Sequence, residues 1–271
     1  MLKLVPTPIG NISDISLRAI EALREADILL CEDTRVTKKL INILKERYNT
    51  SFKEEQRFIP LHSHNEKNFL EELDSSFFDK EVVYVSDAGM PGISDPGQAL
   101  VKYAQENGVE YDVLPGANAL LTAFVASGFI ETKLLFWGFL PHKGSDRTAS
   151  LNGALFSGFT TVLYESPHRL KKLLQEIVKE QPKRKLFLAK EISKKYQTYF
   201  SGTALELLDK INDNFRGEWV VVISQSERQN ASAISENDIL ELDLPKKIQA
   251  KLICKITQEN TKSCYERLFK L

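Results

Sequence analysis

Residues Val82–Gly97, read as V-V-Y-V-S-D-A-G-M-P-G-I-S-D-P-G, show the pattern from which the fold class follows. The first four are β-branched or aromatic and predict a short buried strand. The residues after them contain too much Gly, Pro and Asp to continue as strand or helix, so they predict a loop. A strand that ends in a small-residue loop with a carboxylate, before a helix, is typical of ligand sites in open α/β sheets. The alternative is an ordinary connection in which Asp95 only forms a turn.

Strand and helix patterns alternate on both sides of this segment. Further strands are predicted at residues 2–5, 28–31, 58–61 and 111–114. Helices are predicted from Asp14 with Ser13 as the N-cap, and at 36–46, 67–73 and 99–106. Such alternation predicts a mainly parallel sheet with right-handed crossovers.

The pattern changes after the Pro-Gly turn at residues 115–116. A buried small-residue helix is predicted at 119–125, strands at 134–139, 160–164, 185–189, 198–201 and 219–224, and helices at 169–179 and 204–211. Residues 140–150 are predicted as a polar loop, and the close strand spacing predicts a mixed sheet. The fold class is therefore α/β, with two α/β domains at 1–116 and 117–226. A linker and a small basic helical module are predicted at 227–271.

Polar clusters follow four of the predicted strands in the first domain. They read P-T-P-I-G-N from Pro6, E-D-T-R from Glu32, H-S-H-N-E from His62 and S-D-A-G-M-P from Ser86. In a parallel sheet the carboxyl ends of the strands share one edge, so these clusters are expected to converge there. That convergence predicts an active site.

Composition sets limits on the class of protein. The chain has 271 residues and a net charge of −1, so any contact with nucleic acid must come from a local basic patch. Its three cysteines are scattered, which argues against a disulfide framework and favours a reducing cytoplasm. No apolar run approaches the ~20 residues of a membrane span. The strand-like start leaves no room for a signal peptide.

A local basic patch is present near the C-terminus. Residues 245–271 carry seven basic and two acidic side chains, a net charge of +5. Apolar residues lie at helical spacing in this segment: Ile248, Leu252, Ile253 and Ile256, then Tyr265, Leu268 and Phe269. Two interpretations of this segment stay open: a small basic helical module that contacts RNA, or a solvated helix that docks on the rest of the protein.

The loops resemble those of the tetrapyrrole methylase superfamily, S-adenosylmethionine-dependent methyltransferases with two α/β domains. The motifs V-P-T-P-I-G-N, E-D-T-R, V-S-D-A-G-x-P, L-P-G-x-x-A, Y-E-S-P-H-R and G-E-x-V-V-V are similar to those of the bacterial ribosomal RNA small subunit methyltransferase I group. That group methylates the ribose 2′-hydroxyl of a cytidine in the decoding centre of 16S ribosomal RNA. The resemblance covers nearly the whole chain. Two positions depart from the pattern, with Ser63 in place of Asp and Lys190 in place of Arg.

The resemblance implies that S-adenosylmethionine binds between the two domains. The implied cofactor-binding residues are Pro8, Asp87, Gly89, Met90, Asn118, Ala119, Tyr164, Gly217 and Glu218. It also implies 16S ribosomal RNA or the small ribosomal subunit as the partner, a homodimer and no membrane association.

Methylation of a ribose hydroxyl requires positioning and a group that accepts the hydroxyl proton. The candidate catalytic residues are Asp33, His64 and Glu191. A structural histidine at His64 and a structural ion pair between Asp33 and Arg35 are the alternatives. The candidate RNA-binding residues are Arg35, Lys143, Arg147, Arg169, Lys190, Lys246 and Lys247. No metal is needed, and the four histidines show no metal-ligand spacing.

Two other functions compete with this reading. A tetrapyrrole C-methyltransferase would have the same fold and a carbon acceptor on an anionic macrocycle. A non-catalytic RNA-binding assembly factor would keep the fold without binding S-adenosylmethionine. A nucleotide-binding oxidoreductase is disfavoured because no G-x-G-x-x-G opens the first helix.

Overall fold

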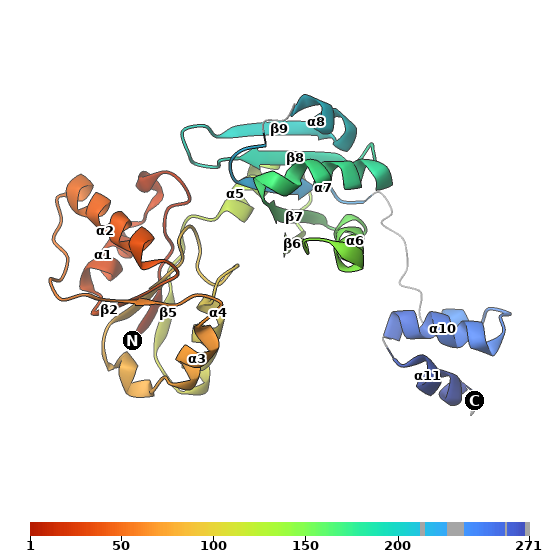
Figure 1. The fold of residues 1–271 in the computed structure, drawn as a ribbon, viewed down its shortest axis with the longest axis horizontal. Coiled ribbons are helices and arrows are strands. Elements are labelled where there is room, and N and C mark those ends of the chain that lie inside the picture. The colour runs from red at the N-terminus through yellow and green to blue at the C-terminus, as the bar shows by residue number, and fades with distance from the viewer. Residues whose placement is uncertain (212–214, 227–235, 258, 269–271) are drawn as a thin grey trace. The chain divides into compact units, whose positions relative to one another are not determined.

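The structure is a computed structural model that describes residues 1–211, 215–226, 236–257 and 259–268 (Figure 1). Its contacts divide the chain into two compact units, residues 1–225 and residues 226–271. Unit 1 contains two five-stranded sheets, each covered by helices. The domain boundaries expected at residues 116 and 226 remain predictions.

The first sheet is entirely parallel, with strand order β3-β2-β4-β1-β5. Its strands are β1 (Leu2–Leu4), β2 (Ile28–Cys31), β3 (Arg57–Pro60), β4 (Val82–Val85) and β5 (Tyr111–Val113). We call this sheet and its helices the first lobe, and the second sheet and its helices the second lobe. The helices of the first lobe are α1 (Leu17–Glu25), α2 (Thr34–Tyr48), α3 (Glu66–Glu71) and α4 (Gly97–Glu106). Short 3-10 helices span Ile12–Asp14 and Ser75–Asp79. The predicted alternation of strand and helix is confirmed.

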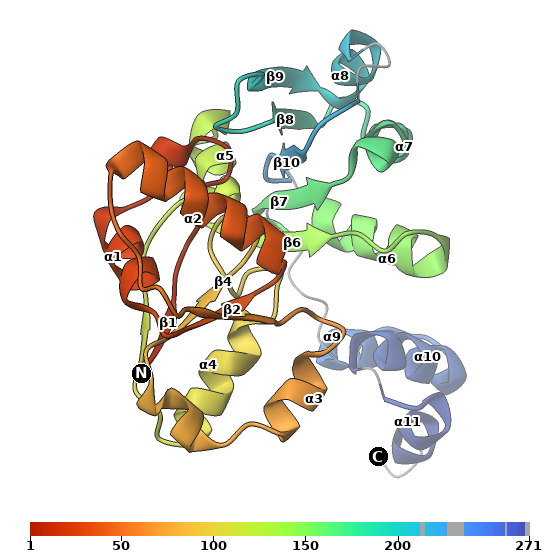
Figure 2. The ribbon, with the colours of Figure 1, turned by 60° about the vertical axis from the view of Figure 1, so that its left-hand side comes forward.

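Strand β4 is buried on both faces because helices cover the sheet on both sides (Figure 2). Val83 and Val85 pack with residues of α1 and α2, whereas Val82 and Tyr84 pack with residues of α4. Successive side chains of a strand point to opposite faces, so an uninterrupted apolar run is what such a strand requires.

The second sheet is mixed, as predicted, with strand order β6-β7-β10-β8-β9. It contains β6 (Leu134–Phe139), β7 (Thr160–Glu165), β8 (Lys185–Lys190), β9 (Thr198–Thr203) and β10 (Trp219–Ile223). Only the β6–β7 pair is parallel; the other pairs are antiparallel. Helix α5 (Ala119–Ser127) packs on one face. Helices α6 (Gly144–Leu155), α7 (Pro167–Glu180) and α8 (Ala204–Lys210) pack on the other.

Two local predictions were wrong. The N-cap of α1 is Ser16, whose hydroxyl accepts the Ala19 amide, and the helix begins three residues after Asp14. The predicted polar loop at 140–150 is largely helix α6, because Leu151, Ala154 and Leu155 bury one side of it. The first residues of α6 are polar, so the sequence shows no apolar helical pattern there.

Unit 2 is a small helical module built from α9 (Glu236–Leu240), α10 (Lys246–Thr257) and α11 (Thr261–Leu268). Its core contains Ile239, Ala250, Ile253 and Cys264. Ile248 and Ile256 are exposed, so the helical spacing of apolar residues in α10 does not by itself identify the residues of this core. Of the linker and helical module predicted at 227–271, residues 227–235, 258 and 269–271, which include Phe269, lie outside the described residues.

No helix in the described part of the chain has the length and apolar character needed to cross a membrane.

Candidate functional site

The polar clusters that follow β1, β2 and β4 are joined by hydrogen bonds at the carboxyl edge of the first sheet. Thr7 and Gly89 exchange two backbone hydrogen bonds of 3.0 Å each, and the Thr7 hydroxyl donates to the Ser86 carbonyl. Gly89 has a φ of +85°, a conformation that glycine adopts without strain. Three of the four predicted clusters therefore converge, whereas the cluster after β3 takes part in none of these hydrogen bonds.

The second and fourth loops hold each other through their carboxylates. The Glu32 carboxylate accepts the Asp87 amide at 3.0 Å, and the Asp87 carboxylate accepts the Asp33 amide at 3.0 Å. Partial burial raises the pKa of both Glu32 and Asp87. These two groups therefore bind a proton more readily than an ordinary surface carboxylate.

Asp95 organises the loop that follows β4. One of its carboxylate oxygens accepts the Tyr84 hydroxyl and the amides of Gly92 and Gly97, at 2.8 to 3.0 Å. A side chain on Gly97 would place its Cβ 2.7 Å from the Gly92 nitrogen, so the turn requires glycine there. Asp95 therefore forms the turn, and it also lines a small pocket together with the loop that it organises.

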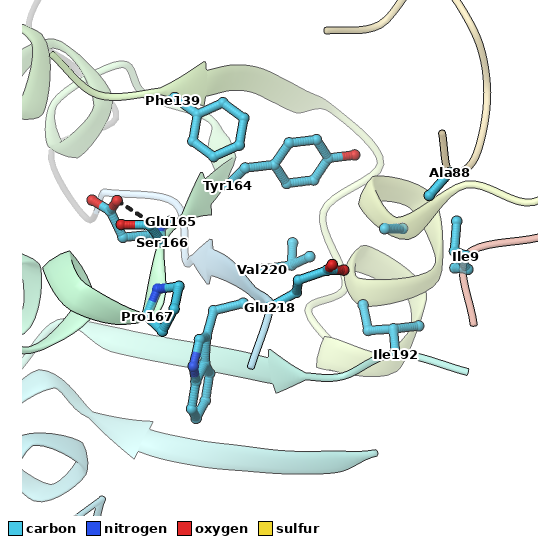
Figure 3. Close-up of a pocket in the computed structure, with 12 residues that line it drawn as sticks. Ile9, Ala88, Phe139, Tyr164, Glu165, Ser166, Pro167, Ile192, Glu218 and Val220 are labelled. Atoms are coloured by element: carbon cyan, nitrogen blue, oxygen red, sulfur yellow. Dashed lines mark hydrogen bonds between the residues drawn. The ribbon is translucent and has the colours of Figure 1, made fainter. Parts of the chain in front are cut away.

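A cavity of about 400 Å³ lies within unit 1 (Figure 3). Residues of both lobes line it: Ile9, Ala88, Ala119, Phe139, Tyr164, Glu165, Ser166, Pro167, Ile192, Glu218, Trp219 and Val220. A smaller pocket of about 70 Å³ shares Ile9, Ala88, Ala119 and Tyr164 with it and extends to Gly89, Met90 and Asn118. The walls are mostly apolar with a few polar groups, as in small-molecule sites.

Six of the nine predicted cofactor-binding residues line one or both pockets: Gly89, Met90, Asn118, Ala119, Tyr164 and Glu218. Pro8, Asp87 and Gly217 line neither, although each is next in sequence to a lining residue. Asp87 is directed instead toward the start of α2, where it accepts the Asp33 amide.

Asn118 and Tyr164 also serve the first turn of α5. The Asn118 side chain accepts the Leu121 amide at 3.0 Å as the N-cap of the helix. Burial raises the pKa of Tyr164, and a hydrogen bond with the backbone of Leu120 partly opposes that rise. Both polar groups therefore hold the helix that forms one wall of the cavity.

A buried charge network, which the sequence did not reveal, lies at the end of β7, where Glu165 also lines the cavity. The Glu165 carboxylate is 2.7 Å from Arg169 and 3.4 Å from Arg147. It also accepts the Ser166 amide (Figure 3). Arg147 is only 1% exposed and also pairs with Glu176 at 2.9 Å. The network fixes the junction between β7 and α7, where Ser166 and Pro167 line the cavity.

The guanidinium of Arg147, which was predicted to bind RNA, is buried and paired with two carboxylates, so it does not face a phosphate in this structure. Arg169 is likewise engaged, with Glu165, the Ser166 hydroxyl and the Leu140 carbonyl. Both arginines carry structural rather than exposed charge in this conformation.

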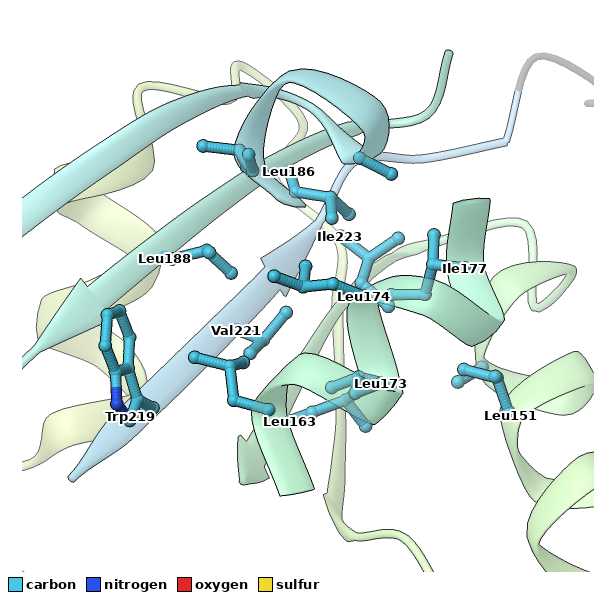
Figure 4. Close-up of a cluster of buried hydrophobic side chains, with 14 of the residues drawn as sticks. Leu151, Leu163, Leu173, Leu174, Ile177, Leu186, Leu188, Trp219, Val221 and Ile223 are labelled. Atoms are coloured by element: carbon cyan, nitrogen blue, oxygen red, sulfur yellow. The ribbon is translucent and has the colours of Figure 1, made fainter. Parts of the chain in front are cut away.

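Trp219 joins the cavity to the main core of the second lobe. It begins β10 and packs with Leu163, Leu188 and Val221, and its indole N–H donates to the Phe215 carbonyl (Figure 4). The Lys190 ammonium lies 5.3 Å from the centre of the Trp219 ring.

The three predicted catalytic residues differ in their ability to accept a proton. Hydrogen bonds from Arg35 lower the pKa of Asp33 to about 2, so Asp33 is a weak base and its ion pair with Arg35 is structural. Although partial burial opposes it, hydrogen bonds from the Glu218 amide and Lys194 lower the pKa of Glu191. His64 is exposed, with its ring edge-to-face with that of His62.

The remaining predicted RNA-binding side chains are positioned differently. Arg35 and Lys143 are exposed in unit 1, and the Arg35 side chain is 89% exposed although it pairs with Asp33. In unit 2, Lys246 and Lys247 are exposed on the first turn of α10, where Lys251 and Lys255 follow on the same helix.

Within the described ranges, no three His, Cys, Asp or Glu side chains are placed so that they could hold a metal ion. The three cysteines are free thiols, and burial raises the pKa of Cys31 to about 11.

Comparison with known proteins assigns a family to this architecture. The model of the tetrapyrrole (corrin/porphyrin) methylases matches residues 1–208. A protein of Campylobacter fetus subsp. fetus named ribosomal RNA small subunit methyltransferase I is 46% identical over 270 residues, 99% of each chain. A protein of Helicobacter pylori strain J99 with the same name is 44% identical over 278 aligned positions, 98% of this chain and 96% of that one.

A solved structure of uroporphyrin-III C-methyl transferase from Thermus thermophilus, complexed with S-adenyl homocysteine, is similar in fold. Its TM-score is 0.53 at 15% identity, and the match covers 82% of this chain and 96% of that one.

Replacing Arg147 tests the buried network. Arg147→Met leaves the Glu176 carboxylate without its guanidinium and Glu165 with only one. Removal of one partner from a buried ion pair is strongly destabilising, so we expect the free energy of unfolding to fall by roughly 3 kcal/mol. Urea unfolding followed by circular dichroism measures this.

Arg35→Met is the matched control, because its ion pair with Asp33 is exposed and such pairs contribute little to stability. Equal stability of the Arg147 and Arg35 variants would contradict a structural role for the network.

Proposed function

The chain belongs to the tetrapyrrole methylase family, and on that basis we propose that it methylates the ribose 2′-hydroxyl of a cytidine in the decoding centre of 16S ribosomal RNA. The methyl donor is S-adenosylmethionine, the cofactor of this methyltransferase family. The observation that carries the proposal is the near full-length match to ribosomal RNA methyltransferases, which includes the C-terminal helical module. Tetrapyrrole enzymes resemble this chain in fold at much lower identity.

The cavity suits a nucleoside cofactor. Its volume of about 400 Å³ is within the range of small-molecule sites, roughly 300–1,000 Å³. Phe139 and Tyr164 supply an aromatic wall, with ring centres 5.6 Å apart, and Pro167 and Val220 add apolar surface. The Glu218 carboxylate can accept hydrogen bonds from hydroxyl or amino groups of the ligand. The smaller pocket at Gly89, Met90 and Asn118 extends the same space.

When bound, S-adenosylmethionine supplies a methyl group on a positively charged sulfur. The protein then has to orient a ribose hydroxyl toward that methyl group and accept the hydroxyl proton. The ribose oxygen would exchange its proton for that methyl group, so the protein has to place a base beside the hydroxyl.

Asp87 is the group we assign to proton acceptance. It is exposed, lies next to the cavity residue Ala88, and uses one carboxylate oxygen to accept the Asp33 amide. Its second oxygen has no protein partner in the described residues. Because burial raises its pKa, it is a better proton acceptor than Asp33, whose pKa is about 2. This replaces the cofactor contact expected for Asp87 from the sequence.

RNA contacts are proposed for exposed cations of both units. Arg35 and Lys143 in unit 1 and Lys246 and Lys247 in unit 2 can bind phosphates without sequence preference. Lys190 and His64 complete the proposed set, with His64 positioning the nucleotide. A cytoplasmic location accompanies a ribosomal substrate.

The resemblance also implies a homodimer. Leu121 and Val125 on α5, and Ile130 after it, are 50%, 78% and 92% exposed and form apolar surface suited to a subunit contact.

The substrate can be identified by product analysis. Purified protein and S-adenosylmethionine are incubated with small subunits that lack the modification, with naked 16S ribosomal RNA, and with uroporphyrinogen. We expect 2′-O-methylcytidine in digests of the RNA by mass spectrometry. A base-methylated nucleoside would contradict the ribose assignment, and methylation of uroporphyrinogen alone would favour a tetrapyrrole C-methyltransferase. Absence of any methylation and of S-adenosylmethionine binding, with RNA binding retained, would favour the assembly factor.

Asp87→Asn separates proton acceptance from cofactor binding. The amide oxygen of Asn can still accept the Asp33 amide, but the side chain no longer takes up a proton. We expect the methylation rate to fall by roughly 10²–10⁴-fold while affinity for S-adenosylmethionine, measured by calorimetry, stays unchanged. Because the pKa of Asp87 is raised and the base acts when deprotonated, the wild-type rate should fall as pH falls through that pKa. If Asp87→Asn instead loses affinity for S-adenosylmethionine at an unchanged methylation rate, the result would support the predicted cofactor contact of Asp87.

Charge reversal on α10 tests the tail. Changing Lys246, Lys247 and Lys251 to Glu should weaken RNA binding and flatten its salt dependence, because fewer counterions are released. Filter binding at several salt concentrations measures both. Reversal of the acidic pair Glu241 and Asp243 to Lys is the control. If both the affinity for RNA and the activity on assembled subunits stay unchanged, α10 does not take part in RNA binding.

A further inference from the structure

The turn between β8 and β9 has an unusual backbone. Glu191 and Ser193 have φ values of +52° and +66°, in the left-handed region that side chains other than glycine rarely adopt. Such conformations persist only where the surroundings impose them, and they concentrate at functional sites. Ile192, between these two residues, lines the cavity.

Toward the second lobe, this turn holds Glu218, the residue directly before β10. The Glu191 carboxylate accepts the Glu218 amide at 2.7 Å and the Lys194 ammonium at 3.1 Å. The same ammonium is 3.1 Å from the Glu218 carboxylate. A Cβ at Gly217 would lie 2.9 Å from the Glu191 side chain, which explains the glycine before Glu218.

Toward the first lobe, the same turn packs on the loop after β1. A Cβ at Gly10 would lie 2.5 Å from Cγ and 2.9 Å from the backbone nitrogen of Lys194. The turn and the loop after β1 are therefore in direct contact. The Ser193 hydroxyl also donates a hydrogen bond to Asp14. Gly10 directly follows Ile9, which lines both pockets.

Lys194 thus touches the segments that carry three cavity residues: Ile9, Ile192 and Glu218. Figure 3 shows the Glu218 carboxylate directed toward the side of the cavity where Ile9 and Ile192 lie. We propose that Lys194 is a positioning residue that holds the Glu218 carboxylate and the Ile9 loop in the arrangement that binds S-adenosylmethionine. This inference rests on the proposed function, in which the cavity is the cofactor site.

The electrostatics explain why a cation is required there. Without Lys194, the carboxylates of Glu191 and Glu218 would lose the cation that bridges them, and we expect the largely exposed Glu218 side chain to turn away. Lys194 is 30% exposed and Glu218 is 77% exposed. The ion pair between Lys194 and Glu218 is so exposed that it contributes little to folding stability, and its loss should act on ligand affinity. The pair between Lys194 and Glu191, whose side chain is 20% exposed, is the one whose loss can lower stability.

Calorimetric titration of the full-length protein with S-adenosylmethionine and with S-adenosylhomocysteine tests the proposal. Lys194→Met should weaken binding about tenfold, the loss expected for one charge-assisted hydrogen bond. Lys194→Arg should restore most of the affinity because it keeps the charge. The matched control is Lys195→Met, which removes a neighbouring exposed cation that contacts only the Tyr196 ring among the interactions of the described residues. The melting temperatures of wild type, Lys194→Arg and Lys195→Met should agree, and Lys194→Met should remain folded at the temperature of the titration.

A double-mutant cycle shows whether Lys194 acts through Glu218. Lys194→Met should have little further effect on affinity in a Glu218→Gln background, because its partner carboxylate is then already neutral. Additive losses, or equal affinity of wild type and Lys194→Met, would overturn the inference while leaving the proposed function intact. A wild-type protein that binds neither ligand would overturn both.

Discussion

The parallel pairing of β1, β2 and β4 is the constraint on which the site depends. Parallel strands deliver their carboxyl ends to one edge, so loops that are distant in sequence begin side by side. Backbone amides and carboxylates then join these loops, from Thr7 to Gly89 and from Asp87 to both Glu32 and Asp33. The loops are therefore held by short hydrogen bonds to a buried sheet, and a site built from them is preorganised before any ligand arrives.

Charge is distributed in this site according to what each group must do. Asp33 and Glu191 accept hydrogen bonds from cations and amides, which lower their pKa values and make them fixed structural anions. Glu32 and Asp87 are partly withdrawn from water and pair with no cation among the described residues, and their pKa values are raised. Neighbouring carboxylates with different environments thus divide into groups that hold structure and groups that can exchange a proton.

The second lobe is held at the cavity by buried ion pairs, which require the desolvation of charged groups. Glu165 is fully buried at the end of β7, and two arginines compensate it. A buried carboxylate needs such partners because desolvation of an unpaired charge is severe. The arrangement fixes the residues that start α7, and it explains why basic residues that resemble an RNA-binding set in sequence are internal in the folded protein.

The amino-acid sequence by itself determined most of the secondary structure, the parallel and mixed sheets, and the clustering of polar loops at one edge. These properties follow from local periodicity and from strand alternation, which neighbouring residues encode. The family resemblance, rather than periodicity, pointed to Gly89, Asn118 and Glu218, which line the cavity or the smaller pocket beside it. Helix α6 was missed because its apolar side becomes visible only from what it packs against.

Only the tertiary structure decided which charged side chains are free to act. Arg147 and Lys143 are equivalent in sequence, yet one is buried beside Glu165 and the other is exposed. Asp33 and Asp87 are likewise equivalent until Arg35 lowers the pKa of the first and burial raises that of the second. The role of Lys194 arises from Gly10, Glu191 and Glu218, which are far apart in the chain. Burial and ion pairing depend on distances in space, which sequence spacing does not encode.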